Sequence, residues 1–144
     1  GKTRSMAIAE VSTPLQLYIV DTANFMKGEI TVSFRNEGNE PVRIPDEIND
    51  ETSDFFFVTV LRTQQGKMRV LNREIGTMTF QRPLNYRELA PGQEYSVTIP
   101  VCLDEVDLEG WKQCSCELET RYYNQQGKDC FLGVLRATAR LTLQ

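Results

Sequence analysis

Residues 28–45 read GEITVSFRNEGNEPVRIP, and this stretch decides the fold class. The apolar residues of ITVSF alternate with polar ones, which is the period-two pattern of a strand with one buried face. NEGNEP predicts a turn, because Asn and Gly tolerate a positive φ and Pro41 restricts the exit. The alternation resumes in VRI. We therefore expect two strands joined by a short polar turn.

The same alternation recurs on both sides of this stretch, in LQLYIV (15–20), YSVTIPV (95–101), CSCELETRYY (114–123) and FLGVLRATARLTL (131–143). FFFVTVL (55–61) is apolar on both faces, which suits a central strand or one covered by a loop. No window of ten or more residues has the spacing of a helix. We predict an all-β fold, an immunoglobulin-like antiparallel β-sandwich of roughly seven to nine strands with little or no helix, and a barrel is the structural alternative.

The length and composition indicate one domain and argue against catalysis. With 144 residues, we expect residues 1–13 to form a flexible or edge N-terminal segment and residues 14–144 a single sandwich domain. Histidine is absent, which excludes Ser-His-Asp and Cys-His catalysis and every His-containing metal site. The net charge of −4 argues against a nucleic-acid surface. We expect a protein that is not an enzyme and that has no cofactor, no metal and no catalytic residue.

The N-terminus leaves the compartment open. GKTRSM lacks the apolar core of a signal peptide. Either Gly1 is the scar of a cleaved tag on an exported domain, or Met6 is the native start of a cytosolic protein. A periplasmic or cell-surface location is slightly favoured over a cytoplasmic one. No apolar run approaches the roughly 18 residues that cross a bilayer, so we expect no membrane insertion.

The last two strands predict a tight hairpin with Gln126 and Gly127 as its loop residues, since glycine supplies the positive φ that such turns need. In this register Cys116 faces Ala137 on one side of the sheet. Glu117 meets Arg136 on the other side. This cross-strand complementarity supports the hairpin.

The four cysteines are interpreted as structural. The hairpin directs Cys114 and Cys116 into the core and places Cys130 on the opposite face, while Cys102 has the outward parity of its strand. We expect buried thiols that pack as small hydrophobic groups. One disulfide of unknown connectivity and a four-thiolate zinc site stay open as alternatives, although paired C-x-x-C motifs are absent. No histidine or C-x-x-C motif is present to lower the pKa of a catalytic thiol.

The loop DEINDETSD (46–54) is rich in carboxylates, which are the ligands that calcium prefers. Its spacing does not match the twelve-residue calcium loop with a central glycine. We expect a solvated acidic loop, and calcium binding stays open.

Three aromatic residues are the predicted partner-binding residues: Phe55, Phe57 and Trp111. In a strand, Phe55 and Phe57 share one face, and an uncovered pair would mark a partner surface. The alternative is that a loop covers them. Trp111 stands three residues before Cys114 and is interpreted as a corner anchor, with a carbohydrate platform as the alternative. The arginines of the poorly patterned region predict dispersed surface charge, or a surface for an acidic partner: Arg69, Arg73, Arg82 and Arg87.

ITVSFRNEGNEPVRI (30–44) followed by LAPGQEYSVTIPV (89–101) resembles a pattern of bacterial immunoglobulin-like modules. Residues 30–101 are similar to the bacterial intracellular proteinase inhibitor family and to the accessory sandwich domain of deuterolysin-type metallopeptidases. The resemblance implies a sandwich fold and, in the first case, proteinase inhibition. No inhibitory loop can be carried over residue by residue.

Together these observations predict a binding module that recognises a protein partner through loops or through a sheet edge. The alternatives are a proteinase inhibitor-like protein and a carbohydrate-binding or cell-surface accessory domain. The oligomeric state stays open.

Overall fold

The computed structural model describes residues 14–46, 48–73, 85–103, 115–124, 127 and 129–143. Nine strands lie in these ranges: β1 (Leu15–Asp21), β2 (Glu29–Asn36), β3 (Val42–Pro45), β4 (Phe57–Thr63), β5 (Met68–Val70), β6 (Tyr86–Leu89), β7 (Glu94–Pro100), β8 (Ser115–Asn124) and β9 (Gly133–Thr142). Every strand pairing among them is antiparallel. The predicted all-β sandwich is therefore confirmed. The prediction for residues 1–13 lies outside the described residues.

The described residues contain two short helical segments, η1 (Phe25–Lys27) and α2 (Ser53–Phe56). This small helical content agrees with the sequence pattern, which lacks the spacing of a helix. Neither segment has the length and apolar character that a membrane-spanning helix needs.

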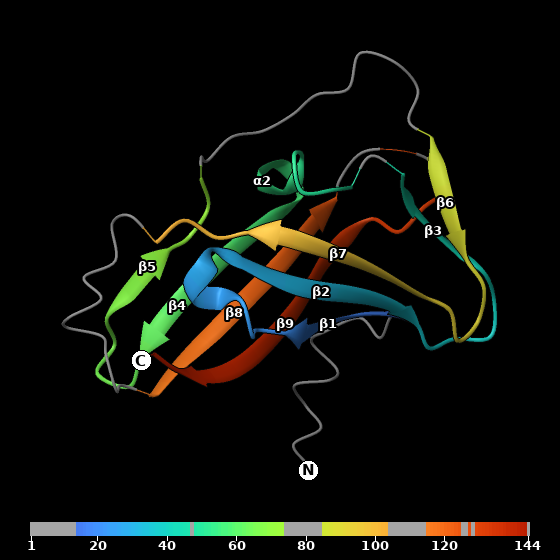
Figure 1. The fold of residues 1–144 in the computed structure, drawn as a ribbon. Coiled ribbons are helices and arrows are strands. Elements are labelled where there is room, and N and C mark those ends of the chain that lie inside the picture. The colour runs from blue at the N-terminus through green and yellow to red at the C-terminus, as the bar shows by residue number, and fades with distance from the viewer. Residues whose placement is uncertain are drawn as a thin grey trace, which may run out of the picture.

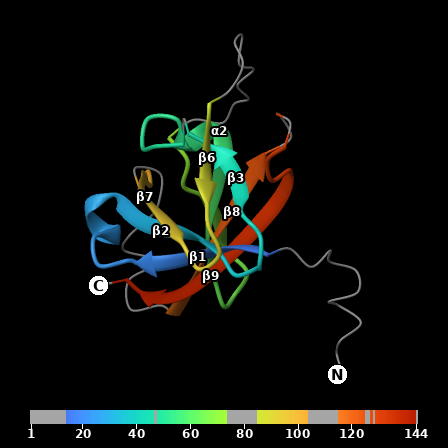
Figure 2. The same cartoon turned by 90° about the vertical axis from the view of Figure 1, so that its right-hand side faces the viewer.

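The strands form two layers and a small ribbon (Figure 1). One layer has the strand order β1-β2-β7, and the other has the order β5-β4-β8-β9. β3 and β6 pair as a separate ribbon at one end, which Figure 2 shows from its own side. The edge strands β1 and β9 lie against each other and close one side of the sandwich (Figures 1 and 2). β7 is the edge of its sheet on the other side.

The core lies between the two layers and follows the predicted alternation. Val32 and Phe34 of β2 are fully buried, as the sequence pattern predicts. The Phe34 ring meets the edge of Tyr122 from β8, with 4.9 Å between the ring centroids. Phe57 of β4 lies 5.5 Å from the same tyrosine ring. This aromatic contact joins the two sheets near the centre of the molecule.

The turn after β2 forms for a different reason from the predicted one. Among residues 36–41, no backbone φ is positive. The turn is instead held by the side chain of Asn36, which is completely buried. Its amide nitrogen donates to the carbonyl oxygens of Glu40 at 2.8 Å and Leu89 at 2.9 Å, and its oxygen accepts from the Gly38 N–H at 2.9 Å. Gly38 is needed because any Cβ there would collide with Pro14.

The strand predicted at residues 55–61 begins later than expected. Ser53–Phe56 form α2, and β4 starts at Phe57. Both Phe56 and Phe57 are buried, because the helical turn rotates successive side chains toward the same core. The continuous apolar run of residues 55–61 therefore spans the junction between α2 and β4 and does not form one central strand.

The predicted register of the last hairpin is wrong by four residues. Cys116 faces Leu141 and Glu117 faces Arg140, where the sequence predicts Ala137 and Arg136. The connection from β8 to β9 runs from residue 125 to residue 132, so the predicted two-residue loop does not exist. The inward and outward faces are still correct, because a shift by an even number of residues preserves the parity of a strand.

Candidate functional site

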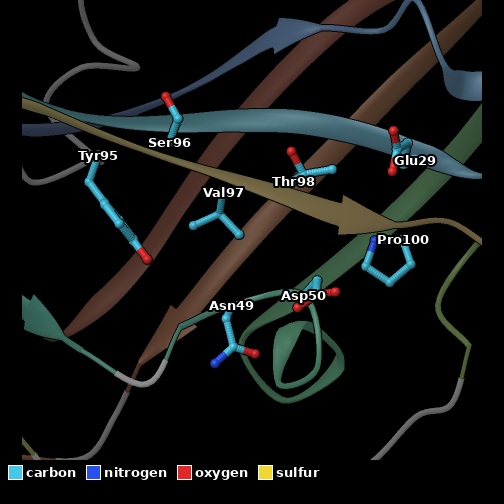
Figure 3. Close-up of a pocket in the computed structure, with 8 residues that line it drawn as sticks. All are labelled: Glu29, Asn49, Asp50, Tyr95, Ser96, Val97, Thr98 and Pro100. Atoms are coloured by element: carbon cyan, nitrogen blue, oxygen red, sulfur yellow. The ribbon is translucent and has the colours of Figure 1, made fainter.

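A pocket of about 330 Å³ opens beside the outer edge of β7 (Figure 3). Figure 3 shows Tyr95 and Val97 extending from β7 toward the loop that carries Asn49 and Asp50. The complete lining is Glu29, Asn49, Asp50, Tyr95, Ser96, Val97, Thr98 and Pro100. The pocket therefore lies between an edge strand and the loop that precedes α2.

The backbone of β7 turns unused hydrogen-bonding groups toward its outer edge. In an antiparallel pair, backbone-bonded residues alternate with non-bonded ones. The Val101 N–H donates to the Gly28 carbonyl at 2.9 Å, and the Asn36 N–H donates to the Gln93 carbonyl at 3.0 Å. Odd-numbered residues of β7 therefore bond to β2. The peptide groups of Ser96 and Thr98 point the other way, and no described residue pairs with them.

Tyr95 sets the distance between β7 and the facing loop. Its hydroxyl donates to the Ile48 carbonyl at 3.0 Å. The Arg87 guanidinium lies 3.9 Å above its ring, and Arg87 also bonds to the Asp46 carboxylate at 2.7 Å. The loop is thus held away from β7 by the length of a tyrosine side chain. This separation leaves room for the roughly 4.8 Å that a hydrogen-bonded neighbouring strand requires.

The loop opposite β7 is shaped by its own side chains. The Asn49 side-chain oxygen accepts from the N–H groups of Glu51 at 2.8 Å and Thr52 at 3.1 Å. In return, the Thr52 hydroxyl accepts from the Asn49 N–H at 3.0 Å. These reciprocal bonds close the turn that precedes α2, and Figure 3 shows the helix directly after Asp50.

A buried carboxylate anchors this loop to the rest of the sandwich. The Asp54 side chain is 5% exposed and lies 3.1 Å from the Arg73 Nε. It also accepts from the Asn72 side-chain amide at 3.1 Å and from the Arg73 N–H at 3.3 Å. Arg73 bonds in addition to the Asp50 carbonyl at 2.7 Å. The pocket rim is therefore fixed to the segment that follows β5.

The pocket lining has a net negative character. Glu29 and Asp50 contribute carboxylates, while no Lys or Arg lines the pocket within the described residues. Ser96 and Thr98 contribute hydroxyls beside their backbone donors and acceptors. These groups suit an extended polypeptide that has unused backbone groups of its own and a basic side chain near Glu29 or Asp50.

The three predicted partner-binding residues are not brought together at this pocket. Phe57 is 2% exposed and fills the core, so its ring does not reach a partner's surface. Phe55 is half-buried against the core. Trp111 lies outside the described residues. The assignment of Phe57 to a partner surface assumed one regular strand through residues 55–57, whereas α2 ends at Phe56 and both Phe56 and Phe57 are buried.

The cysteines that the structure describes have structural surroundings. No disulfide joins any two of Cys102, Cys116 and Cys130, and Cys114 lies outside the described residues. Cys116 is buried, as predicted. Burial raises the pKa of the Cys130 thiol, and hydrogen bonds to Tyr86 and Asn124 oppose this shift without reversing it. A raised pKa disfavours the thiolate, which is the reactive form of cysteine.

The loop between β8 and β9 holds Cys130 in place. Gly127 has a φ of 114°, which favours glycine, and a Cβ there would collide with the Tyr86 hydroxyl and the Cys130 sulfur. The Asn124 side-chain amide donates to the Phe131 carbonyl at 3.1 Å, and the Phe131 N–H donates to the Arg43 carbonyl at 2.9 Å. These anchors explain why Phe131 lies in the loop and not in the predicted strand.

The acidic loop at residues 46–54 pairs with arginines instead of gathering its carboxylates. Asp46, the first residue of the loop, bonds to Arg87, and Asp54, the last residue, bonds to Arg73. Within the part of the chain that the structure describes, no cluster of three or more Cys, Asp or Glu side chains could hold a metal ion. Two of the arginines assigned to dispersed surface charge are therefore intramolecular partners of this loop.

Ser96 and Thr98 were not predicted as site residues from the sequence. Their outward direction follows from the alternation in YSVTIPV, but the alternation does not tell whether another strand covers them. Pro100 is the one usable signal, because proline within a sheet is found at edges and bulges. It occupies the same outward register as Ser96 and Thr98, where a missing N–H breaks no bond to β2.

Compared with models of known protein families and with curated protein sequences, the chain matches none.

Proposed function

We propose that this protein is a binding module that captures an extended segment of a protein partner as an additional strand on β7. The observation that carries the proposal is the outer edge of β7 at Ser96 and Thr98, with which no described residue pairs and which opens into the pocket of about 330 Å³. In strand addition, backbone hydrogen bonds supply affinity and side-chain pockets supply specificity. Both features occur together here.

The length of the usable edge supports a short recognition segment. Ser96 and Thr98 each offer one N–H and one carbonyl group, whereas Pro100 offers only a carbonyl. Proline thus ends the edge at the side where Glu29 lies. An added strand would place one basic side chain near Glu29 or Asp50 and apolar atoms against Val97. These side-chain contacts would make the edge of β7 selective for particular sequences, whereas a bare strand edge can pair with any extended chain.

The strand order also supports the immunoglobulin-like arrangement that the sequence predicts. In such sandwiches the first, second and fifth strands share one sheet, and the third, sixth and seventh share the other. The orders β1-β2-β7 and β4-β8-β9 fit this scheme once the β3-β6 ribbon is treated as an insertion, and β5 pairs with β4 as the additional strand of variable-type domains does. The resemblance to proteinase inhibitors and the carbohydrate-binding alternative stay predictions.

The test is selection of linear peptides from a displayed random library on the full chain, followed by titration of the enriched peptides. Thr98→Pro removes the outward N–H and no backbone bond to β2, although the bond of its hydroxyl to the Thr31 hydroxyl at 3.1 Å is lost as well. We expect it to weaken binding about tenfold or more beyond any effect of losing the hydroxyl. Thr98→Ala is the matched control, because it removes the hydroxyl and keeps the N–H. In the wild-type complex, the amide protons of Ser96 and Thr98 should become protected from exchange with solvent.

Two results would contradict the proposal. One is a set of peptides that bind the Thr98→Pro variant as tightly as wild type. The other is bound peptide without new protection at Ser96 and Thr98, since a partner strand must hydrogen-bond to these groups.

A further inference from the structure

The outer face of the β5-β4-β8-β9 sheet carries a cluster of arginines. Strand parity places Leu61, Leu118 and Tyr122 in the core, so their neighbours along each strand face outward. The charged residues on this outward face are Arg62 from β4, Glu117, Glu119 and Arg121 from β8, and Arg136 and Arg140 from β9.

One carboxylate organises three of these arginines. The Glu119 side chain is only 3% exposed, although it lies on an outward-facing position. Its Oε1 lies 3.3 Å from both the Arg62 Nη1 and the Arg121 Nε, and its Oε2 accepts from the Arg136 Nε. The guanidinium groups cover the carboxylate and are themselves 35%, 44% and 57% exposed, in the same order. Arg62 also lies 3.8 Å from the Glu117 carboxylate, and Arg121 also hydrogen-bonds to Tyr123. Glu119 therefore gathers three partly exposed guanidinium groups on this face.

The face as a whole is positive in an acidic chain. Among the described residues of this face, four arginines stand against two glutamates, while the whole chain has a net charge of −4. Arg140 adds a fourth guanidinium whose described hydrogen bond is to the Ser115 hydroxyl at 3.3 Å. Five N–H donors per guanidinium exceed what the two carboxylates of this face can accept. The surplus can bind further carboxylates.

Apolar side chains border this cluster on both sides. Met68 and Val70 of β5 face outward because they stand opposite Arg62 and Val60, and they are 48% and 41% exposed. Val134 of β9 is 50% exposed and stands opposite the outward-facing Tyr123. Arginine next to exposed aliphatic and aromatic groups is typical of protein interfaces.

These features favour an acidic protein segment over other anions. The two uncompensated positive charges are few beside the roughly six to ten phosphate contacts of a typical nucleic-acid site. The negative charge of the rest of the chain would repel a nucleic acid or an anionic membrane. An acidic peptide with aliphatic residues matches both the guanidinium groups and the bordering Met68, Val70 and Val134.

We propose that the outer face of the β5-β4-β8-β9 sheet, centred on Arg62, Arg121 and Arg136, is a second binding surface that recognises an acidic protein segment containing aliphatic residues. This surface lies on the opposite sheet from the β7 edge, so the module has two independent sites.

The test uses the full chain and a short fluorescein-labelled peptide that is rich in Glu with interspersed Leu residues. We expect saturable binding that weakens as salt concentration rises. Arg140→Glu should weaken binding about tenfold or more, since it reverses a charge on the face and leaves the bonds of Glu119 intact. Arg43→Glu is the matched control, because Arg43 lies on β3, away from this sheet face, and is similarly exposed.

Thr98→Pro separates this surface from the β7 edge and should leave binding of the acidic peptide unchanged. The proposal is overturned if Arg140→Glu and Arg43→Glu weaken binding equally, or if the Glu-rich peptide does not bind. It is also overturned if vesicles containing phosphatidylserine or a DNA duplex bind this face more tightly than the peptide does. Loss of binding in the Thr98→Pro variant alone would assign the peptide to the β7 edge and overturn the second site.

Discussion

Glu119 on β8 and Arg62 on β4 lie 3.3 Å apart across two neighbouring strands, on the face of the sheet that points away from the core. A carboxylate on such a face is normally solvated, yet the Glu119 side chain is 3% exposed. The arginines from three strands replace water around it. This arrangement links β4, β8 and β9 through one side chain and connects the stability of the sheet to the proposed acidic-peptide surface.

Glu119→Gln should lower the free energy of unfolding by about 2 kcal/mol, because hydrogen bonds to a charged acceptor are lost while the volume is conserved. The half-exposed arginines regain part of this loss by binding water. Chemical denaturation measures the change. Glu117→Gln is the control, since the Glu117 side chain is 43% exposed and its contact with Arg62 is 3.8 Å long. An equal effect of the two substitutions would contradict the role of Glu119.

The stability contributed by Glu119 should depend on pH. Burial raises the pKa of this carboxyl, but the hydrogen bond from Arg136 and the charges of Arg136 and Arg121 outweigh burial, so the pKa is lowered from its ordinary value of 4.5. A lowered pKa in the folded state means that the contribution is complete above pH 4.5 and is lost as the pH falls through the lower folded value. Unfolding curves of wild type and Glu119→Gln should therefore converge below pH 4.5 and stay apart at neutral pH. Curves that converge on raising the pH would contradict this sign.

Tyr122→Phe should leave the free energy of unfolding unchanged or raise it by about 1 kcal/mol. The Tyr122 hydroxyl is completely buried and has no hydrogen-bond partner within the described ranges. A buried hydroxyl without a partner costs desolvation energy, which the phenylalanine avoids. Burial, with a smaller effect from Cys130, raises the pKa of Tyr122 far above its ordinary value, which is consistent with this environment. Thermal and chemical denaturation measure the change.

The control for this substitution is Tyr122→Ala, which removes the ring that contacts Phe34 and Phe57. We expect it to lower the free energy of unfolding by roughly 3–5 kcal/mol. A loss of more than about 1 kcal/mol in Tyr122→Phe would instead show that the hydroxyl makes a stabilising hydrogen bond.

The layered architecture could be predicted from the sequence because strand parity is a local property. Successive side chains of a strand point to opposite faces, so Ile30, Val32 and Phe34 face the core while the polar residues between them point to the other face. Register is not local in this way. The hairpin prediction assigned the correct faces to Cys116 and Leu118 but the wrong partners, because the anchors that lengthen the loop come from Asn124 and from Arg43 on a distant strand.

The candidate site was harder to predict for a related reason. Whether Ser96 and Thr98 are available depends on which strand lies beside β7, and this is a property of sheet order that alternation does not contain. The prediction for Phe57 was misleading because hydrophobicity alone does not tell a surface patch from a core. Phe57 is buried since α2 ends immediately before it and changes the direction of the chain.

Asp54→Ala should destabilise the fold and weaken peptide binding at β7 together. The substitution leaves the Asn72 amide and the Arg73 Nε without the carboxylate they share, and we expect a loss of about 3 kcal/mol in the free energy of unfolding. Since Arg73 also holds the Asp50 carbonyl, the rim of the pocket should become less ordered, and faster amide exchange at residues 49–52 measures this.

Asp46→Ala is the matched control, because it removes an acidic residue of the same loop whose ion pair with Arg87 is exposed. Such exposed pairs contribute at most about 1 kcal/mol. If the two alanine variants destabilise the protein equally, the carboxylates of this loop act only through general charge. If Asp54→Ala alone accelerates exchange at residues 49–52, the buried bonds of Asp54 set the geometry of the pocket, and peptide affinity should fall with them.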